Sequence, residues 1–578
     1  MFKQKRIMPT SKTIRLILII ALLAPSTKLS ATEWGFPSRQ NPQQSPETSS
    51  TDTSRAKIAD FLTNLEPFGF SGGVLVAKNS EIIVSRGLGF ADREHKISCT
   101  ENTAFDIGSN TKDFTKLAIL QFAERGKLKL SDTVGQYFPS APPDKSGITI
   151  EQVMAHTAGF PEYTGDDTEM ISRDEMLTRL FTRALISAPG EEMNYSNPGY
   201  SLLAAIIEKL SGDSYEKYVY LNIFKPAGMD HTGYVRPEWK PAQIAHAYDN
   251  GHDQGSSLDY AHLPDGPTWN LRGNGGTLST IPDMYKFHLA LEGNLLLSDA
   301  SKAKLFPQDR PLILVGGNGI HEFAYFRDPS QKLVILAAST DAGLKATDLA
   351  KPLSAIIAGR NILAPPKTIA MPAGGIAFRA GKYVLPSGAY FVLSTSSDAL
   401  LASPRGAEAF HLVSTGAAPD PDRVAATTSR MIDILRAAEK GDYAPWSQAF
   451  GGGVPVDAIK ARQEPLKRTR ESKYGPYKGF EIVGLSLDDE DLIVTVQLNF
   501  ERDSSYTRYV WGPRRLAGAQ PLESAPTVRF LPESPTDFAS YDLPTATSIR
   551  IHFEPTSNSA AQFTMTGTAG AATATRQP

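Results

Sequence analysis

The sequence predicts an α+β fold, an α/β sandwich in which helices flank an antiparallel sheet with a mainly helical insertion, plus C-terminal β-rich and α+β regions. Two observations lead to this prediction. Residues 71–92 read as two strands, and strand-like apolar runs return at 311–317, 320–328 and 332–340. The sequence between these two groups is mostly helical in pattern. Strands at both ends of one segment favour a single antiparallel sheet on which the helices pack.

The first 31 residues have the three parts of a secretory signal. They carry six Lys or Arg and no acid, and they contain an apolar run at 16–24. They end at Ala31 with small residues that suit a cleavage site. A membrane anchor is the alternative, but an apolar run of nine residues is well short of the ~20 that span a bilayer. We therefore expect a signal peptide over 1–31, cleaved near Ala31, and a secreted or periplasmic mature chain without a transmembrane segment.

Charge and cysteine content narrow the possible functions. The formal net charge is −3, and loss of the six positive charges of the signal peptide makes it −9. The chain therefore has no excess of positive charge that would indicate nucleic-acid binding. Cys99 is the only cysteine, which excludes an internal disulfide in an exported chain. The residues around Cys99 contain no pattern of a catalytic partner, so we interpret Cys99 as a buried structural thiol.

The N-terminal half begins with a polar segment. Residues 32–55 are rich in Pro, Ser and Thr, which is typical of a linker. A short amphipathic helix is expected at 56–66, followed by the two strands, whose turn we place at Asn79–Ser80. In the helical middle, two apolar helices are predicted to stop at Gly126 and Gly212, because glycine is a common C-cap.

Pro and Gly residues at 361–375 mark a linker after a first domain that spans 56–360. Beyond this linker, residues 376–416 alternate like a small β-rich region. Residues 420–556 read as helix followed by antiparallel strands, an α+β domain. The polar end of the chain, 557–578, is predicted to be a disordered tail. The composition of these C-terminal regions indicates no particular chemistry. That they carry the protein's main function remains an open alternative.

Two serines compete as the nucleophile. Ser71 lies in GFSGG (69–73), which fits G-x-S-x-G, the pattern of a nucleophile elbow. Such an elbow leads directly into a helix, whereas the residues after Ser71 alternate as in a strand. We therefore reject Ser71 and interpret its glycines as easing the entry into the first strand.

Ser109 is the second candidate, in FDIGSNTKDFTKLAIL (105–120). Lys112 follows three residues later, so both side chains share one helix face. A lysine amine can take the serine proton only when it is neutral, and burial among apolar residues lowers its pKa towards that state. The start of the helix also offers the backbone N–H of Ser109 to a developing oxyanion.

The pattern S-x-x-K alone is weak support, because it recurs at 54–57, 214–217 and 301–304. An N-cap serine with a solvated lysine explains any of these occurrences. The surrounding sequence is therefore what separates Ser109 and Lys112 from the other three.

From about 56 to 360 the chain resembles the serine β-lactamase and penicillin-binding-protein superfamily, in its class C-like branch. The matching segments follow the family's order and are GGVLVAKNSEIIVSRGLGFAD, FDIGSNTKDFTKLAILQFAERGKLKLSDTVGQYFP, ITIEQVMAHTAGFPEY, APGEEMNYSNPGYSLLAAIIEKLSG, FKPAGMDHTGY and GNGGTLSTIPDMYKFHLAL. The resemblance implies a serine hydrolase that forms an acyl-enzyme on Ser109 and needs no metal or organic cofactor.

The resemblance also assigns roles within YSN (195–197). Tyr195 would shuttle the proton between the nucleophile and the leaving group, and Asn197 would hold the lysine and the substrate amide. Tyr-x-Asn recurs at 220–222 and 248–250, but only the first occurrence follows a Pro-Gly turn and opens a helix, as in the family. A tyrosine in this role must lie near the lysine ammonium to be partly ionised, since its free pKa is ~10.

The third family element departs from its pattern. The family shows Lys-Thr-Gly or His-x-Gly on an edge strand, where this chain has Val315, Gly316 and Gly317. Backbone donors near Gly317 and Asn318 can still complete an oxyanion hole, because that role needs no side chain. The cation that would bind a substrate carboxylate is missing. His321 is one substitute, although strand histidines are more often structural. The departure weakens a β-lactamase or D,D-carboxypeptidase interpretation most.

We therefore expect an exported serine hydrolase that acts on an ester, an amide or a D-amino-acid peptide, including peptides derived from peptidoglycan. The alternative is a catalytically degenerate module that binds cell-wall peptides or a protein partner, which the altered third element favours. His246, His252 and His262 match no zinc-ligand spacing, so no metal site is expected.

Overall fold

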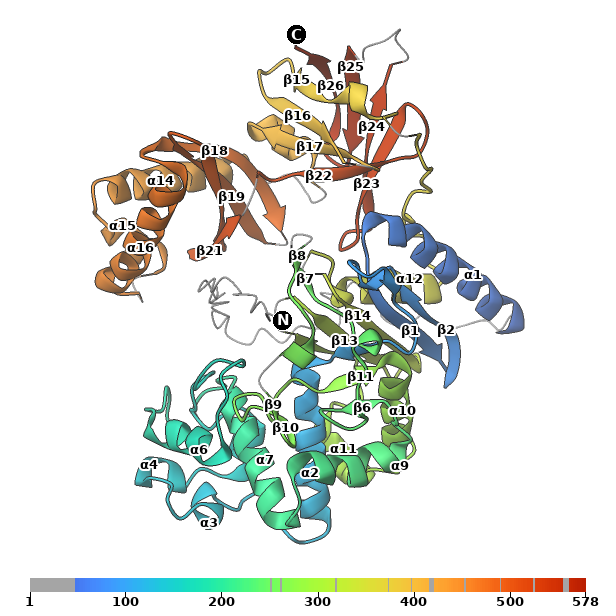
Figure 1. Cartoon of the computed structure of the whole chain (residues 1–578), viewed down its shortest axis with the longest axis vertical. Helices are drawn as coiled ribbons and strands as arrows, with labels where there is room; N and C mark the ends of the chain where they lie inside the picture. The colour runs from blue at the N-terminus through green and yellow to red at the C-terminus, as the bar shows by residue number, and fades with distance from the viewer. Residues whose placement is uncertain are drawn as a thin grey trace, which may run out of the picture. The chain divides into compact units, whose positions relative to one another are not determined.

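The computed structural model describes residues 47–577 apart from 250–251, 260–261, 318–319, 342, 373, 397, 415–419, 452–453, 489, 523–524 and 555–560. The described residues form two compact units, which meet in sequence at Pro366 and Lys367 (Figure 1). The predicted signal peptide (1–31) and residues 32–46 of the predicted linker lie outside the described residues. No helix of the described part combines the length and the apolar character needed to span a bilayer.

The first described element corrects the end of the predicted linker. Helix α1 spans Glu47–Leu65, so residues 47–55 are helical. Its later turns bury four apolar side chains, those of Ile58, Phe61, Leu62 and Leu65. These turns correspond to the amphipathic helix expected from residue 56. The Ser- and Thr-rich residues before them have no helical spacing of apolar residues, so no sequence pattern indicates that the helix begins earlier.

A five-stranded antiparallel sheet forms the centre of the N-terminal unit and is assembled from both ends of its sequence, as predicted (Figure 1). The strand order is β12–β13–β14–β1–β2. The strands are β1 (Gly72–Lys78), β2 (Glu81–Leu88), β12 (Leu312–Gly317), β13 (Glu322–Asp328) and β14 (Leu333–Ser339). Between β1 and β2, Asn79 and Ser80 are both left-handed (φ 53° and 65°), the conformation of a tight hairpin turn.

Helices pack against this sheet and fill the insertion between β2 and β12. Helix α10 contacts β1 and β14, and α1 contacts β2 and α12. The helices of the unit after α1 are α2 (Thr111–Glu124), α3 (Val134–Tyr137), α4 (Pro143–Ser146), α5 (Ile150–Met154), α6 (Arg173–Thr182), α7 (Asn197–Ser211), α8 (Tyr215–Val219), α9 (Lys225–Ala227), α10 (Ile281–Glu292), α11 (Asp299–Leu305) and α12 (Ala350–Ile357). Helix α7 ends at a left-handed Gly212 (φ 74°), as its sequence predicts.

Short strands complete the N-terminal unit. A three-stranded sheet has the order β5–β11–β6, and β5 ends just before helix α2. The short strands are β3 (Phe90–Asp92), β4 (Ile97–Ser98), β5 (Ala104–Asp106), β6 (Thr232–Gly233), β7 (Tyr248–Asp249), β8 (His252–Asp253), β9 (His262–Leu263), β10 (Gly266–Pro267) and β11 (Leu278–Thr280).

The C-terminal unit is built around a closed eight-stranded barrel (Figure 1). Its strands are β15 (Gly381–Val384), β16 (Tyr390–Thr395), β17 (Leu400–Arg405), β22 (Val528–Pro532), β23 (Asp537–Asp542), β24 (Thr547–Phe553), β25 (Gln562–Gly567) and β26 (Gly570–Arg576). Between β17 and β22 the chain leaves the barrel to form four helices and a four-stranded antiparallel sheet. These are α13 (Ala407–Leu412), α14 (Pro421–Glu439), α15 (Ala444–Ala449), α16 (Val456–Tyr474), β18 (Tyr477–Asp488), β19 (Asp491–Phe500), β20 (Ser504–Trp511) and β21 (Leu516–Leu522).

This barrel differs from the expected domain boundaries. The region 376–416 is not separate from 420–556, because β22, β23 and β24 continue its sheet. The expected disordered tail, 557–578, contains β25 and β26, and β26 closes the barrel on β15 by pairing Arg576 with Tyr383. Alternate residues of the tail, such as Phe563, are fully buried inside the barrel. The polar composition of the tail concealed this alternation.

Candidate active site

The turn that carries Ser109 is tightly packed against the end of strand β12. Residues Gly108–Asn110 form a single 3-10 turn between β5 and α2. Gly108 has a left-handed φ of 50°, and a Cβ atom there would lie 2.2 Å from the Gly317 nitrogen. A Cβ atom on Gly316 would lie 2.7 Å from the Ser109 nitrogen. Both glycines are therefore needed for the close approach of the edge strand to the serine.

Ser109, Lys112 and Tyr195 come together in the structure. The Lys112 Nζ atom lies 3.0 Å from the Ser109 Oγ atom, and the Tyr195 hydroxyl donates to the same Oγ at 2.7 Å. Two groups that can move protons therefore contact one hydroxyl. This is the arrangement in which a serine becomes a nucleophile, because an adjacent base can take its proton.

Lys112 is the group with a pKa suited to that task. Its side chain is only 5 % exposed, and burial lowers the pKa of its amine to about 7. The neighbouring acids Asp167, Asp113 and Glu162 oppose this shift. Nζ also donates to the carbonyl oxygen of Asn274 at 2.7 Å. When the amine is neutral, this bond leaves its lone pair free to face Ser109.

Tyr195 is a proton donor in the resting site. Partial desolvation raises the pKa of its phenol above the ordinary value, although the bond to Ser109 lowers it. The Lys112 Nζ atom lies 4.8 Å from the centre of its ring. The tyrosine therefore lies near the lysine, as the sequence analysis requires of it, while the raised pKa favours the neutral phenol. The ring stacks on His156 at 4.5 Å, and the Nδ1 atom of His156 accepts from the Ser196 N–H at 3.0 Å.

Asn197 lies directly after the YS pair of the site, but its hydrogen bonds are to residues other than Lys112. The N–H of Asn197 donates to the Glu162 carbonyl at 3.1 Å, and its side chain interacts with the Tyr163 hydroxyl. The second hydrogen bond of Lys112 goes to the backbone of Asn274 instead. Sequence reasoning missed Asn274 because a backbone carbonyl has no side-chain signature.

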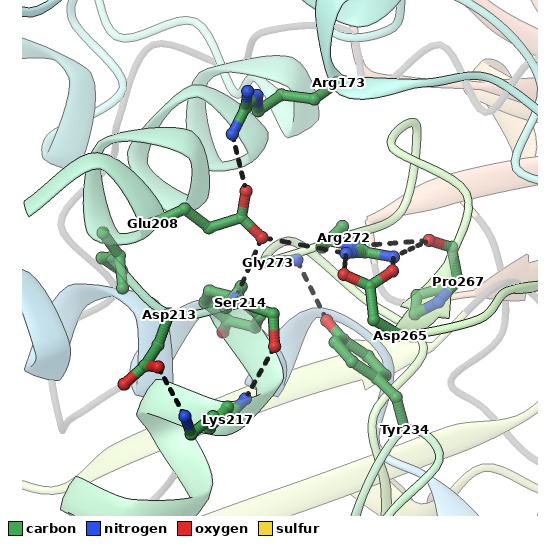
Figure 2. Close-up of polar contacts among 12 residues, drawn as sticks. Arg173, Glu208, Asp213, Ser214, Lys217, Tyr234, Asp265, Pro267, Arg272 and Gly273 are labelled. Carbon is green, nitrogen blue, oxygen red and sulfur yellow. Dashed lines mark hydrogen bonds and ion pairs between the residues drawn. The ribbon is translucent and has the colours of Figure 1, made fainter. Parts of the chain in front are cut away.

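The turn that presents the Asn274 carbonyl is clamped by one tyrosine. The Gly273 N–H donates to the Tyr234 hydroxyl at 3.0 Å, as Figure 2 shows, and that hydroxyl donates to the Gly275 carbonyl at 3.1 Å. Tyr234 therefore holds the backbone on both sides of Asn274. On the nucleophile helix, the Thr115 hydroxyl donates to the Gly273 carbonyl at 2.6 Å.

A buried arginine anchors the same turn (Figure 2). Arg272 is 1 % exposed and makes a two-pronged contact with Asp265, at 2.8 and 2.9 Å. It also donates to the Pro267 carbonyl at 3.0 Å and lies 3.8 Å from Glu208. Every charge in this cluster has a partner, which is the condition under which a buried ion pair holds a fixed geometry.

The predicted oxyanion and binding residues divide into two groups. Gly316 and Gly317 lie against the Ser109 turn, as the glycine contacts above require, and Asn318 lies outside the described residues. His321 is buried, and burial lowers its pKa, so it is neutral near pH 7 and does not replace the missing cation. Val315 is 46 % exposed at the edge of the site and supplies no charge.

His246 and His252 belong to no metal-holding cluster in the part of the chain that the structure describes. Among the described residues, no group of three or more His, Cys, Asp or Glu is arranged to hold a metal ion. His246 pairs through Nδ1 with Asp253 at 2.8 Å, and the side chain of His252 is exposed.

Comparisons with known proteins agree with this geometry. The family model described as "Beta-lactamase" matches residues 65–313. PbpX of Bacillus subtilis (strain 168), which is classed by name with penicillin-binding proteins, is 34 % identical over 268 residues, 46 % of this chain and 66 % of PbpX. Another penicillin-binding protein of that strain is 32 % identical over 265 residues, 43 % of this chain and 57 % of the relative. The chain thus spans less than two thirds of each of these relatives.

Two solved structures also match this chain, over 51 % and 91 % of its length. A penicillin-binding protein from Bacillus halodurans matches with a TM-score of 0.45 and 26 % identity, over 51 % of this chain and 98 % of that one. An octameric penicillin-binding protein homologue from Pyrococcus abyssi matches with a TM-score of 0.48 and 16 % identity, over 91 % of this chain and 100 % of that one.

Proposed function

We propose that this chain is a serine hydrolase of the serine β-lactamase and penicillin-binding-protein superfamily, because the β-lactamase family model matches residues 65–313 and PbpX is 34 % identical over 268 residues. Its substrate would be an ester, an amide or a D-amino-acid peptide, cleaved through an acyl-enzyme on Ser109. The observation that carries the proposal is the contact of one hydroxyl with both the Lys112 amine (3.0 Å) and the Tyr195 phenol (2.7 Å).

The proposed acylation step follows from these contacts. Neutral Lys112 takes the proton of Ser109 as the Oγ atom bonds to the substrate carbonyl carbon. The developing oxyanion is stabilised by backbone N–H groups of Ser109 and of the β12 end, around Gly317. The Tyr195 hydroxyl passes a proton to the leaving group as its bond to the carbonyl carbon breaks, and the Lys112 ammonium returns the proton taken from Ser109 to the Tyr195 phenolate, so that Lys112 is neutral again. Water then attacks the acyl-enzyme, with the same groups removing its proton.

The test is a panel of p-nitrophenyl esters, nitrocefin and D-alanyl peptides. We expect the wild type to cleave at least one class, and Ser109→Ala to lose that activity. Ser301→Ala is the matched control, because Ser301 belongs to another S-x-x-K segment and should keep wild-type rates. Equal rates for wild type and Ser109→Ala would remove Ser109 from the mechanism.

A binding module without catalysis is the second candidate function, and exposed Val315 favours it. The missing cation would weaken the hold on a carboxylate-bearing substrate. Such a module would bind cell-wall peptides or a protein partner through the same site. In the panel above it would show no turnover in either protein, while calorimetry would still detect binding of D-alanyl peptides to the wild type.

Export of the chain is part of the proposal. Residues 1–31 have the basic, apolar and small-residue parts of a secretory signal, which supports a secreted or periplasmic enzyme. Expression of the full chain in a Gram-negative host should give a periplasmic protein whose first residue is Thr32. Recovery of the uncleaved chain from the cytoplasm would contradict export.

A further inference from the structure

Tyr195, the proposed proton donor, lies on a loop and depends on its neighbours for a fixed position. It comes just before helix α7 and is 37 % exposed, so protein packing covers only part of its ring. Its hydroxyl has to stay within hydrogen-bond distance of Ser109 during the reaction, because proton transfer requires that geometry. Several contacts of this loop come together at one residue, His156.

His156 follows helix α5 and has a well-defined backbone conformation. Its φ of 59° is left-handed, a region in which histidine is enriched among non-glycine residues. Its N–H donates to the Val153 carbonyl at 3.2 Å. One residue further on, the Tyr200 hydroxyl of α7 donates to the Met154 carbonyl of α5 at 2.8 Å. The end of α5, which carries His156, is thus tied to the helix that Tyr195 precedes.

Two hydrogen bonds connect His156 to the residues on either side of Tyr195. The Asn194 N–H donates to the His156 carbonyl at 2.7 Å, and the Ser196 N–H donates to the His156 Nδ1 atom at 3.0 Å. The peptide units before and after Tyr195 therefore both have their partner on this one residue. Such contacts fix the backbone from which the phenol projects.

The imidazole ring also supports the phenol directly. The rings of His156 and Tyr195 stack with 4.5 Å between their centres and 28° between their planes. The bond from the Ser196 N–H requires a neutral imidazole whose Nδ1 atom carries no proton. Burial and the positive charges of Lys112 and Lys116 lower the pKa of His156 to about 3, so the ring is neutral at pH 7.

We propose that His156 is a positioning residue that holds the Tyr195 phenol on Ser109 for proton transfer to the leaving group. This inference rests on the proposed serine hydrolase function. In acylation, the phenol gives its proton to the leaving oxygen or nitrogen as the bond of that atom to the carbonyl carbon breaks. The Lys112 ammonium, which has taken the proton of Ser109, then returns a proton to the phenolate. His156 itself gains and loses no proton in these steps.

The dependence of the rate on the leaving group follows from this role. Ethoxide is a strong base, so an ethyl ester has to receive a proton as its C–O bond breaks. p-Nitrophenolate is a weak base and leaves without a proton. A displaced Tyr195 therefore slows cleavage of an ethyl ester far more than cleavage of the p-nitrophenyl ester. A general loss of folded protein would slow both esters alike.

The test compares the p-nitrophenyl and ethyl esters of two acyl groups, butyryl and N-acetyl-D-alanyl. His156→Ala should lower kcat/KM for the ethyl ester at least tenfold and kcat/KM for the p-nitrophenyl ester less than threefold. His156→Asn should recover part of the loss, because Asn tolerates a left-handed φ and its Oδ1 atom can accept from the Ser196 N–H. An equal loss on both esters in His156→Ala would overturn the proposal.

His288→Ala is the matched control. His288 is also part-buried, burial lowers its pKa to about 4, and its Nδ1 atom lies 2.8 Å from the Tyr325 hydroxyl. This variant should lose thermal stability and keep the wild-type ratio of kcat/KM between the two esters. A change of that ratio as large as in His156→Ala would overturn the proposal, since any buried histidine would then have the same effect.

A double-mutant cycle shows whether His156 acts through Tyr195. In a Tyr195→Phe background the proton donor is already absent, so His156→Ala should lower kcat/KM for the ethyl ester less than twofold further. If the two losses multiply instead, His156 acts by another route and the proposal is overturned.

Labelling with a fluorophosphonate separates failure of this inference from failure of the proposed function, because fluoride is a weak base and leaves without a proton. If the wild type is labelled on Ser109 but cleaves none of these esters, or His156→Ala leaves the ester ratio unchanged, the inference is overturned while the nucleophile stands. If Ser109 is not labelled at all, the proposed function fails and this inference fails with it.

Discussion

The protonation state of Lys112 governs the chemistry at the scale of single residues. Its amine is buried, and the nearest hydrogen-bond partners are the Ser109 hydroxyl and the Asn274 carbonyl. Neither partner carries a charge that would hold the ammonium form. With a pKa of about 7, the amine changes between acid and base close to neutral pH. Activity should follow that change.

A pH profile of kcat/KM on an uncharged ester tests this. Only the neutral amine can accept the serine proton, so kcat/KM should rise with pH through a midpoint near 7 and level off above pH 8. Below pH 6 it should fall about tenfold for each pH unit, because one proton is gained. A flat profile between pH 5 and 9 would show that Lys112 is not the base.

Lys112→Arg provides the control for that profile. A guanidinium keeps its proton throughout this range, so the variant retains the charge and loses the base. We expect kcat to fall by a factor on the order of 10² to 10⁴, with no recovery at high pH. A variant that keeps the wild-type profile would assign the midpoint to another group.

Single residues were predictable where a side chain carries the chemistry. Ser109, Lys112 and Tyr195 were identified by residue type and sequence context, and the structure brings them within hydrogen-bond distance. The Asn274 carbonyl was missed because its role depends on the backbone path. The direction of the Tyr195 pKa could not be predicted either, since it depends on how far the ring is desolvated.

At the scale of elements, the site depends on the close approach of β12 to the 3-10 turn before α2. Gly108 allows this approach through both its left-handed φ and its missing Cβ. Gly126 has a similar φ (66°), but a Cβ atom there would meet nothing within 4 Å. Substitution of Gly126 therefore introduces backbone strain alone, whereas substitution of Gly108 introduces backbone strain and a steric clash.

Gly108→Ala and Gly126→Ala should behave differently. Gly126→Ala should cost about 1–2 kcal/mol of stability, from the left-handed conformation alone, and keep full activity. Gly108→Ala should cost more and abolish turnover, because the new Cβ would push β12 away from Ser109. Thermal unfolding and kcat measure the two effects. Similar activities for the two variants would mean that the approach of β12 is not required.

The turn around Asn274 allows a second prediction. Tyr234→Phe removes the hydroxyl that bonds the Gly273 N–H and the Gly275 carbonyl. Loss of these buried bonds should cost about 1–3 kcal/mol of stability. The Asn274 carbonyl should then be less well held, so kcat should fall on the order of tenfold and the pH midpoint should move.

Tyr285→Phe is the matched control for Tyr234→Phe. Tyr285 is also buried, but its hydroxyl has no hydrogen-bond partner among the described residues. Its removal should leave stability, kcat and the pH midpoint near wild-type values. If Tyr234→Phe changes stability alone and leaves the pH midpoint in place, Tyr234 does not position the lysine.

Elements were predictable where their signal is local. The β1–β2 hairpin follows from its alternation and turn residues, and the end of α7 follows from Gly212. The start of α1 was missed because its first residues carry no apolar period. Strand β12 was predicted as a strand, but its contact with the Ser109 turn could not be, since the two lie about two hundred residues apart in sequence.

At the scale of the whole molecule, the chain folds as two compact units, and the C-terminal unit depends on its last strands. Strand β26 pairs with β15 and with β25, so it closes the barrel. The buried side chains of Phe563, Met565 and Ala574 fill the barrel core from these strands. Such closure joins residues almost two hundred positions apart and is invisible to local patterns, which is why this segment was taken for a tail.

Truncation tests the barrel. A chain ending at residue 560 lacks β25 and β26, so it should lose the closure and much of the apolar core of the barrel. We expect its C-terminal unit to unfold at a lower temperature and to become sensitive to limited proteolysis, while Ser109 labelling persists. Removal of residues 577–578 alone is the control and should change neither property. Unchanged protease resistance after the longer truncation would contradict the closed barrel.

The central claim is that Ser109 is a nucleophile activated by a neutral Lys112. The most direct measurement is the position of the covalent adduct after reaction with a fluorophosphonate at pH 8, located by tandem mass spectrometry. The account predicts one adduct, on Ser109, formed far more slowly in Lys112→Arg. An adduct on another serine such as Ser71, or equal labelling of the wild type and Lys112→Arg, would contradict it.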